Sequence, residues 1–197
     1  MQADREVLKS SEELERLLRR SGQAALAHFR GVRVETKQDS SPVTVADRES
    51  EAVLMEGLAQ LFPDDSVVSE EGGRLEGTSG RCWYVDPIDG TAAFIEGLAH
   101  WGPVVGCMDA EGPCEGGVFM PRTGDFYWAR RGEGAWLNGN RLSPLCAEPA
   151  TRQSVMYVPS RFHQYVRFDF EGKLRSLGGT AAHLALVAGG SAVGAVV

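Results

Sequence analysis

Four short apolar segments follow one another between residues 101 and 142 with only a turn between each pair. The segments cover residues 101–109, 115–120, 125–130 and 135–142, and every turn between them contains glycine. Strands joined by such short turns pair antiparallel, because a parallel pair needs a crossover of about a dozen or more residues. The pattern therefore predicts an antiparallel meander, and any helices must lie on its faces or edges.

Two segments before these strands have the spacing of amphipathic helices. Apolar residues recur every three or four positions over residues 4–30 and again from Thr44 to about Leu61. Further strands are predicted at 66–69, 82–85, 153–158 and 192–197, and shorter helices at 91–96 and 180–188. Helices that flank a mostly antiparallel sheet give the α+β class, in the form of a layered α-β-α(-β) sandwich.

Charge and hydropathy argue against two classes of partner. The net charge of −7 disfavours a nucleic-acid polymer, whose binding depends on Lys and Arg that displace counterions from phosphates. No apolar run approaches the ~20 residues of a membrane-spanning helix, and the charged N-terminal residues contain no apolar core of a secretory signal. We therefore expect a cytoplasmic protein with no membrane partner. A small anionic substrate stays compatible with the acidic charge, because a bound divalent cation can invert the local field.

The sequence DPIDGT carries the strongest chemical signal. Its two carboxylates, Asp86 and Asp89, follow a predicted strand, and the carbonyl of Ile88 lies between them in the chain. Carboxylate and carbonyl oxygens are the ligands that Mg²⁺ prefers. The amides of Gly90 and Thr91, at the start of a predicted helix, favour an anion beside the cation. Alone, however, the same residues are also typical of a tight turn with an Asp helix cap.

Two other acidic positions also have a structural as well as a chemical interpretation. Glu70 and Glu71 could be a solvated loop pair, yet they directly follow a predicted strand, so at least one would be held there as a third carboxylate. Thr44 and Asp47 have the spacing of a helix capping box, and a capped helix can also aim Asp47 at a neighbouring hydroxyl. The four histidines are scattered and are assigned packing or surface roles, because hard cations seldom bind imidazole.

These motifs form an ordered set along nearly the whole chain. The set comprises Lys37, residues 41–44, Asp47, residues 70–71, Trp83 and residues 85–91, followed by 134–139 and 174–182. It resembles the inositol monophosphatase family of Mg²⁺-dependent, lithium-sensitive phosphatases. That family includes inositol-phosphate, histidinol-phosphate and 3′-phosphoadenosine-5′-phosphate phosphatases, and the resemblance implies its layered fold.

The resemblance also implies a role for individual residues. The metal ligands would be Glu70, Asp86, the Ile88 carbonyl and Asp89. Thr91, supported by Asp47, and Glu70 would activate the attacking water. The substrate-binding residues would be Asp89, Gly90, Thr91, Gly179 and Thr180. The implied reaction is hydrolysis of a small phosphorylated alcohol, similar to inositol monophosphate, by metal-activated water with Mg²⁺ as cofactor.

One departure from the family concerns its Trp-Asp motif, whose Asp is a metal ligand and contacts the leaving group. The motif follows the strand that corresponds to residues 192–197, and this sequence stops at Val197. We therefore expect residues 1–150 to form an N-terminal α+β metal-binding domain and residues 151–197 to begin a truncated C-terminal α/β domain. The alternatives are a weakly active or inactive relative that binds metal or anion, or a histidinol-phosphate or 3′-phosphoadenosine-5′-phosphate phosphatase. The family also implies a homodimer.

Overall fold

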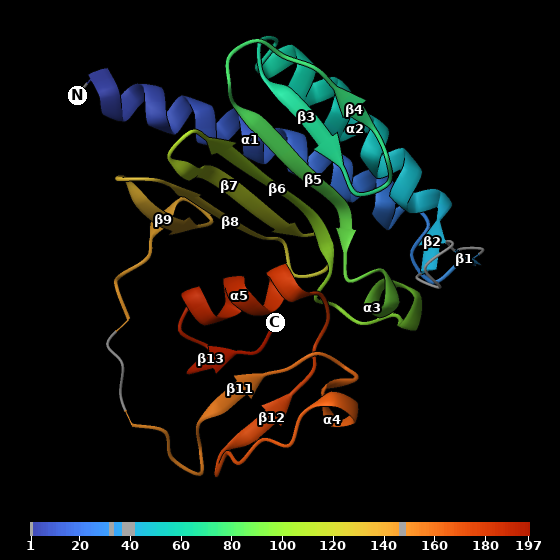
Figure 1. Cartoon of the computed structure of the whole chain (residues 1–197), viewed down its shortest axis with the longest axis vertical. Helices are drawn as coiled ribbons and strands as arrows, with labels where there is room; N and C mark the ends of the chain where they lie inside the picture. Colours follow the sequence, from blue (N-terminus) through green and yellow to red (C-terminus); the bar gives the residue numbers. More distant parts are fainter. Residues whose placement is uncertain (1, 32–33, 37–41, 146–148) are drawn as a thin grey trace.

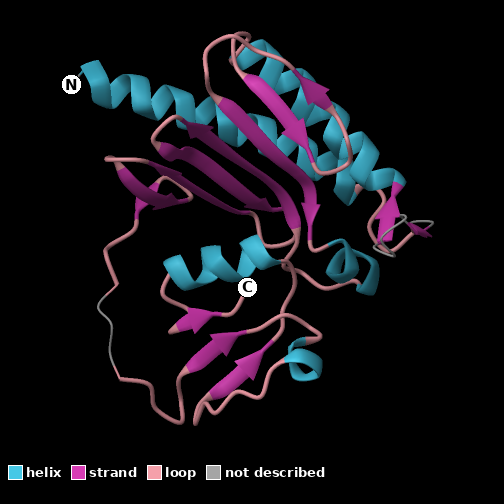
Figure 2. Cartoon of the chain, in the orientation of Figure 1, coloured by secondary structure: helices cyan, strands magenta, loops and turns pink. Residues whose placement is uncertain are grey.

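Helices and sheets are stacked in four layers in the computed structural model, which describes residues 2–31, 34–36, 42–145 and 149–197 (Figures 1 and 2). Helices α1 (Gln2–Leu26) and α2 (Val45–Leu61) cover one face of an eight-stranded sheet. Helix α5 (Thr180–Ala188) lies on the other face, between this sheet and a three-stranded one. The layer order confirms the predicted α+β sandwich.

The large sheet contains the predicted meander. Its spatial order is β10-β9-β8-β7-β6-β5-β3-β4, and all neighbours are antiparallel except β3 and β5. The strands are β3 (Ser66–Ser69), β4 (Arg74–Leu75), β5 (Cys82–Asp89), β6 (Gly102–Asp109), β7 (Gly112–Met120), β8 (Asp125–Arg130), β9 (Gly134–Leu137) and β10 (Asn140–Arg141). The strand predicted over 135–142 is a hairpin, because Asn138 and Gly139 both have positive φ (49° and 76°), as a two-residue type I′ turn requires.

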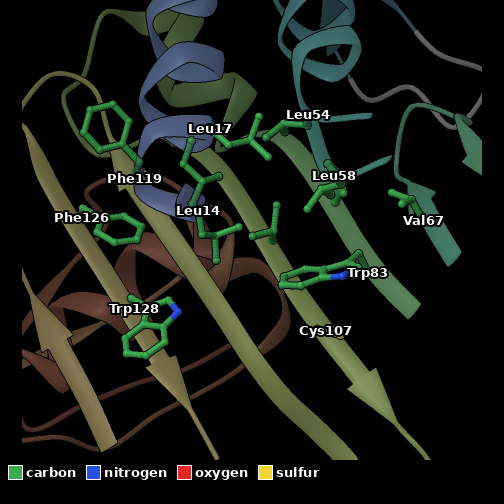
Figure 3. Close-up of a cluster of buried hydrophobic side chains, with 13 residues drawn as sticks. Leu14, Leu17, Leu54, Leu58, Val67, Trp83, Cys107, Phe119, Phe126 and Trp128 are labelled. Carbon is green, nitrogen blue, oxygen red and sulfur yellow. The ribbon is translucent and has the colours of Figure 1, made fainter. Parts of the chain in front are cut away.

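The main core lies between the first two layers. Leucines of α1 and α2 point at the sheet and pack against aromatic side chains of β5, β7 and β8 (Figure 3). Its fully or nearly buried members include Leu14, Leu17, Leu18, Leu54, Leu58, Val67, Trp83, Phe119, Phe126 and Trp128. Burying one such side chain contributes about 1.5–3 kcal/mol, so this layer fixes the sheet to which the site is attached.

The second sheet is parallel. Its order is β12-β11-β13, formed by β11 (Val155–Tyr157), β12 (Lys173–Arg175) and β13 (Gly194–Ala195). The connections between these strands contain α4 (Phe162–Tyr165) and α5, as parallel pairing demands. The boundary expected between residues 1–150 and 151–197 stays a prediction.

Two smaller elements complete the description. Strands β1 (Val34–Thr36) and β2 (Pro42–Thr44) pair antiparallel just before α2, and α3 (Thr91–Glu96) follows β5. Lys37 and Ser41, which contributed to the family resemblance, lie outside the described residues. In the described part of the chain, no helix combines the length and the apolar character needed to span a bilayer.

Candidate metal and phosphate site

The predicted site residues gather where β3 and β5 end. These strands are parallel neighbours with Ser69 paired to Val85, so their carboxyl ends meet at one edge of the sheet. The amide of Glu70 donates to the carbonyl of Val85 at 2.9 Å. Glu70 therefore follows β3 directly beside Asp86, as the sequence predicted.

The DPID residues belong to strand β5, whereas the sequence placed the end of the strand at Asp86. β5 continues to Asp89, which pairs with Gly102 of β6, but the register shifts between Asp86 and Asp89. Pro87 has no N–H to give to the ladder and occupies this irregular stretch, where β-bulges tolerate proline. Because of this register shift, the side chains of Asp86 and Asp89 do not follow the regular up-and-down alternation of a strand.

The carboxylates crowd one another. Burial, followed by the charges of Glu70 and Asp89 and a hydrogen bond with Glu70, raises the pKa of Asp86 to about 8. The Ile88 amide, which donates to Asp86 Oδ1 at 3.0 Å, opposes this shift only in part. Ionisation of Asp86 beside Glu70 and Asp89 is therefore unfavourable, and a divalent cation would favour it by offsetting the burial and the repulsion.

Asp47 joins the first turn of α2 to the start of α3. Its Oδ2 accepts hydrogen bonds from the Thr44 amide and hydroxyl at 2.7 and 2.6 Å, which together with the Ala46 amide donating to Thr44 forms the predicted capping box. Thr91 Oγ1 lies 3.3 Å from Asp47 Oδ1 and 3.1 Å from the Ile88 carbonyl oxygen. Burial raises the pKa of Asp47, while the hydrogen bonds from Thr44 oppose that rise. Both interpretations of Asp47 therefore hold together in one geometry.

Asp89 reaches from the large sheet to helix α5. Its Oδ1 accepts the Thr180 amide at 3.0 Å and its Oδ2 accepts the Ala182 amide at 3.2 Å. The N-cap of α5, Gly179, has no side chain to cap the helix, so Asp89 satisfies amides that the helix itself leaves unpaired. Burial raises the pKa of Asp89, and these amides oppose the rise.

Three glycines let the two chain segments approach this closely. A Cβ on Gly90, whose φ is +87°, would lie 2.7 Å from the Gly179 nitrogen. A Cβ on Gly179 would lie 2.0 Å from Asp89 Oδ2, and one on Gly178 would lie 1.7 Å from the His100 carbonyl oxygen. The predicted substrate residues Gly90 and Gly179 are thus in direct backbone contact.

The sequence did not predict a buried chain of hydroxyls behind the site. Ser50 of α2 donates to the Pro87 carbonyl at 2.9 Å, and Ser21 of α1 lies 2.6 Å from Ser50 Oγ. Because the proton of Ser50 goes to Pro87, Ser21 must donate to Ser50. A serine within a helix does not indicate in the sequence which group it will bind. Only the fold shows that Ser21 and Ser50 hold the DPID segment.

The donor set fits Mg²⁺ in its chemistry, since every proposed donor is a carboxylate or carbonyl oxygen. Within the described ranges, however, no three His, Cys, Asp or Glu side chains stand in an arrangement that could hold a metal ion. Amides of α5 already donate hydrogen bonds to both oxygens of Asp89. A cation beside Glu70 and Asp86 would have to share the Asp89 carboxylate with α5.

Comparisons with known proteins find phosphatases of one family. A histidinol-phosphatase of Chlorobaculum parvum is 35% identical over 91% of this chain and 73% of its own length. A fructose-1,6-bisphosphatase/inositol-1-monophosphatase of Aquifex aeolicus is 32% identical over 80% of this chain, which spans only 63% of that relative. The solved structure of a Thermotoga maritima IMPase superposes with a TM-score of 0.77 at 27% identity, over 90% of this chain and 72% of that one.

A protein-family model also matches nearly the whole chain. The model described as the inositol monophosphatase family matches residues 6–196, which include every residue of the candidate site. The ordered motifs, the layered fold and this match lead to one conclusion. The chain belongs to the inositol monophosphatase family.

Proposed function

We propose that this chain hydrolyses phosphomonoesters of small alcohols with the help of Mg²⁺. One observation carries the proposal: Asp86 is buried close to the charges of Glu70 and Asp89, and burial together with these charges raises its pKa to about 8. Such a concentration of acidic oxygens is costly unless a cation joins it. The phosphatase names of the relatives give the same reaction class.

Four oxygen donors would hold the cation: Glu70, Asp86, Asp89 and the carbonyl of Ile88. Bound Mg²⁺ would polarise the phosphoryl group and neutralise charge on the leaving oxygen. Thr91 would orient the attacking water, because Asp47 and the Ile88 carbonyl already fix its hydroxyl. Glu70 would accept the proton of that water.

The substrate would lie between β5 and α5. The amides of Gly90 and Thr91 would bind the phosphate, and Asp89, Gly179 and Thr180 would contact the alcohol. The Gly90–Gly179 contact supports this placement, because it holds the phosphate side and the alcohol side at a fixed separation.

Release of inorganic phosphate from a panel of phosphomonoesters, with Mg²⁺ and with a chelator, tests the proposal. We expect turnover that requires Mg²⁺, and we expect Asp89→Asn to lower it by about 100-fold or more, because charge stabilisation at the reacting centre is lost. Asp109→Asn is the matched control, since Asp109 lies at the far end of β6 from Gly102, the partner of Asp89. A folded protein without turnover on the whole panel would support the weakly active, metal-binding alternative instead.

Histidinol phosphate should be the first substrate on that panel. The histidinol-phosphatase of Chlorobaculum parvum combines the 35% identity with 91% coverage of this chain. Inositol monophosphate and 3′-phosphoadenosine-5′-phosphate follow as the alternatives that the motifs leave open. A homodimer, the lack of a nucleic-acid or membrane partner, and a cytoplasmic location stay predictions, and sedimentation of the purified chain would test the first.

A further inference from the structure

We propose that His183 is a positioning residue for the substrate: its imidazole holds the turn that leads into Gly179 and Thr180 by accepting the Leu177 amide. This inference rests on the proposed function in one respect, namely that a substrate contacts the turn. Its structural core can be tested without turnover.

The imidazole is held on more than one side. His183 lies in the first turn of α5 with 1% of its surface exposed, and its ring stacks on Tyr157 of β11 with centroids 5.1 Å apart and planes 10° apart. Its Nε2 accepts the Leu177 amide at 3.0 Å. Because an amide can only donate, Nε2 must carry the lone pair and the ring proton must sit on Nδ1.

The turn is fastened at its other end by backbone. The amide of Gly179 donates to the His100 carbonyl at 3.0 Å, and Gly178 lies so close to that carbonyl that no side chain would fit. Thr180 then donates to Asp89. Together with the hydrogen bond from Leu177 to His183, these contacts fix the path of the chain from β12 into α5.

A protonated imidazole cannot provide this anchor. A protonated His183 would turn an N–H toward the N–H of Leu177, which removes the hydrogen bond and leaves two donors facing each other. The titratable groups near it are His100, Tyr157 of β11 and, at the first amides of α5, Asp89. Burial and the proximity of His100 lower the pKa of His183, so the ring stays neutral near pH 7.

Two variants separate the acceptor from the packing. H183F keeps a flat ring against Tyr157 but removes the acceptor, whereas H183Q restores an acceptor that does not titrate. We expect H183F to raise KM for the phosphomonoester about tenfold with little change in kcat, because the lost hydrogen bond positions the substrate side of the pocket. H183Q should keep a KM close to that of the natural chain.

Amide hydrogen exchange of Leu177, measured by NMR on the full chain without metal or substrate, provides the second readout. We expect H183F to lose the protection of this amide and H183Q to keep it. Lowering the pH should reduce protection in the natural chain but not in H183Q. If the chain turns over no phosphomonoester, the proposed function fails while the exchange experiment still decides the role of His183.

Three results would overturn the inference. H183F could retain both KM and Leu177 protection, or H183Q could be as impaired as H183F. If H183F does not fold, ring ¹⁵N shifts of His183 in the natural chain replace it, and a proton on Nε2 would contradict the assigned hydrogen bond.

Discussion

Replacing Gly179 with alanine should disconnect Asp89 from α5. The new Cβ would lie 2.0 Å from Asp89 Oδ2, 2.4 Å from its Cγ and 2.7 Å from its carbonyl carbon. Ordinary contact needs about 3.5 Å, so the carboxylate or the turn must move by more than about 1 Å. Backbone strain does not enter, because Gly179 has φ −69° and ψ 160°, which any residue adopts.

Both stability and catalysis should respond to Gly179→Ala. Overpacking of this kind costs about 1–3 kcal/mol in the free energy of unfolding. A displacement of about 1 Å at a reacting centre lowers the rate by about 100-fold. Urea unfolding and phosphate release with saturating Mg²⁺, at a temperature where both proteins are folded, measure the two effects separately.

Gly106→Ala is the matched control. Gly106 lies inside β6, and nothing stands within 4 Å of where its Cβ would be. We expect unchanged activity and a change in stability below about 1 kcal/mol. Full activity of Gly179→Ala would refute the steric argument, and an equal loss in Gly106→Ala would show that glycine at these positions matters for another reason.

Three shorter predictions follow from the same site. Thr91→Val should lower phosphate release by about 100-fold, whereas Thr91→Ser, which keeps the hydroxyl beside Asp47, should stay within a few-fold of the natural rate. Ser50→Ala leaves the Pro87 carbonyl without its buried donor and should cost about 1–3 kcal/mol in urea unfolding, while Ser50→Thr should cost less if the hydroxyl is what matters. Millimolar Mg²⁺ should raise the melting temperature of the natural chain but not of Asp89→Asn, and equal shifts would remove Asp89 from the metal site.

Local pattern was sufficient for some elements of the fold, but it missed β4 and merged β9 and β10 into one strand. The strands at 66–69 and 125–130 and the helix at 180–188 have the predicted limits. Each has a hydrophobic period or turn residues at both ends, which fix an element without knowledge of its neighbours. The end of β5 was wrong because Pro87 normally stops a strand, and only pairing with β6 shows that the strand resumes.

Contacts between distant segments were beyond such reasoning. The sequence left His183 with a packing or a surface role, and its burial selects packing, but the acceptor role of its Nε2 depends on where Leu177 lies. In the same way, Asp89 was predicted as a ligand, while its bond to the Thr180 amide requires the fold to bring together residues 91 positions apart. The period of a pattern predicts on which face of a helix or strand a residue lies, but not which residues of other elements that face contacts.

The separation in sequence between Asp89 and Thr180 also governs when their hydrogen bond can form. A chain emerging from the ribosome completes the meander at Arg141, well before the first turn of α5 is synthesised. Closing a loop of 91 residues has an entropic cost that only the later docking of α5 offsets. During biosynthesis, the acidic sheet edge therefore exists for a time without the helix whose amides bind Asp89.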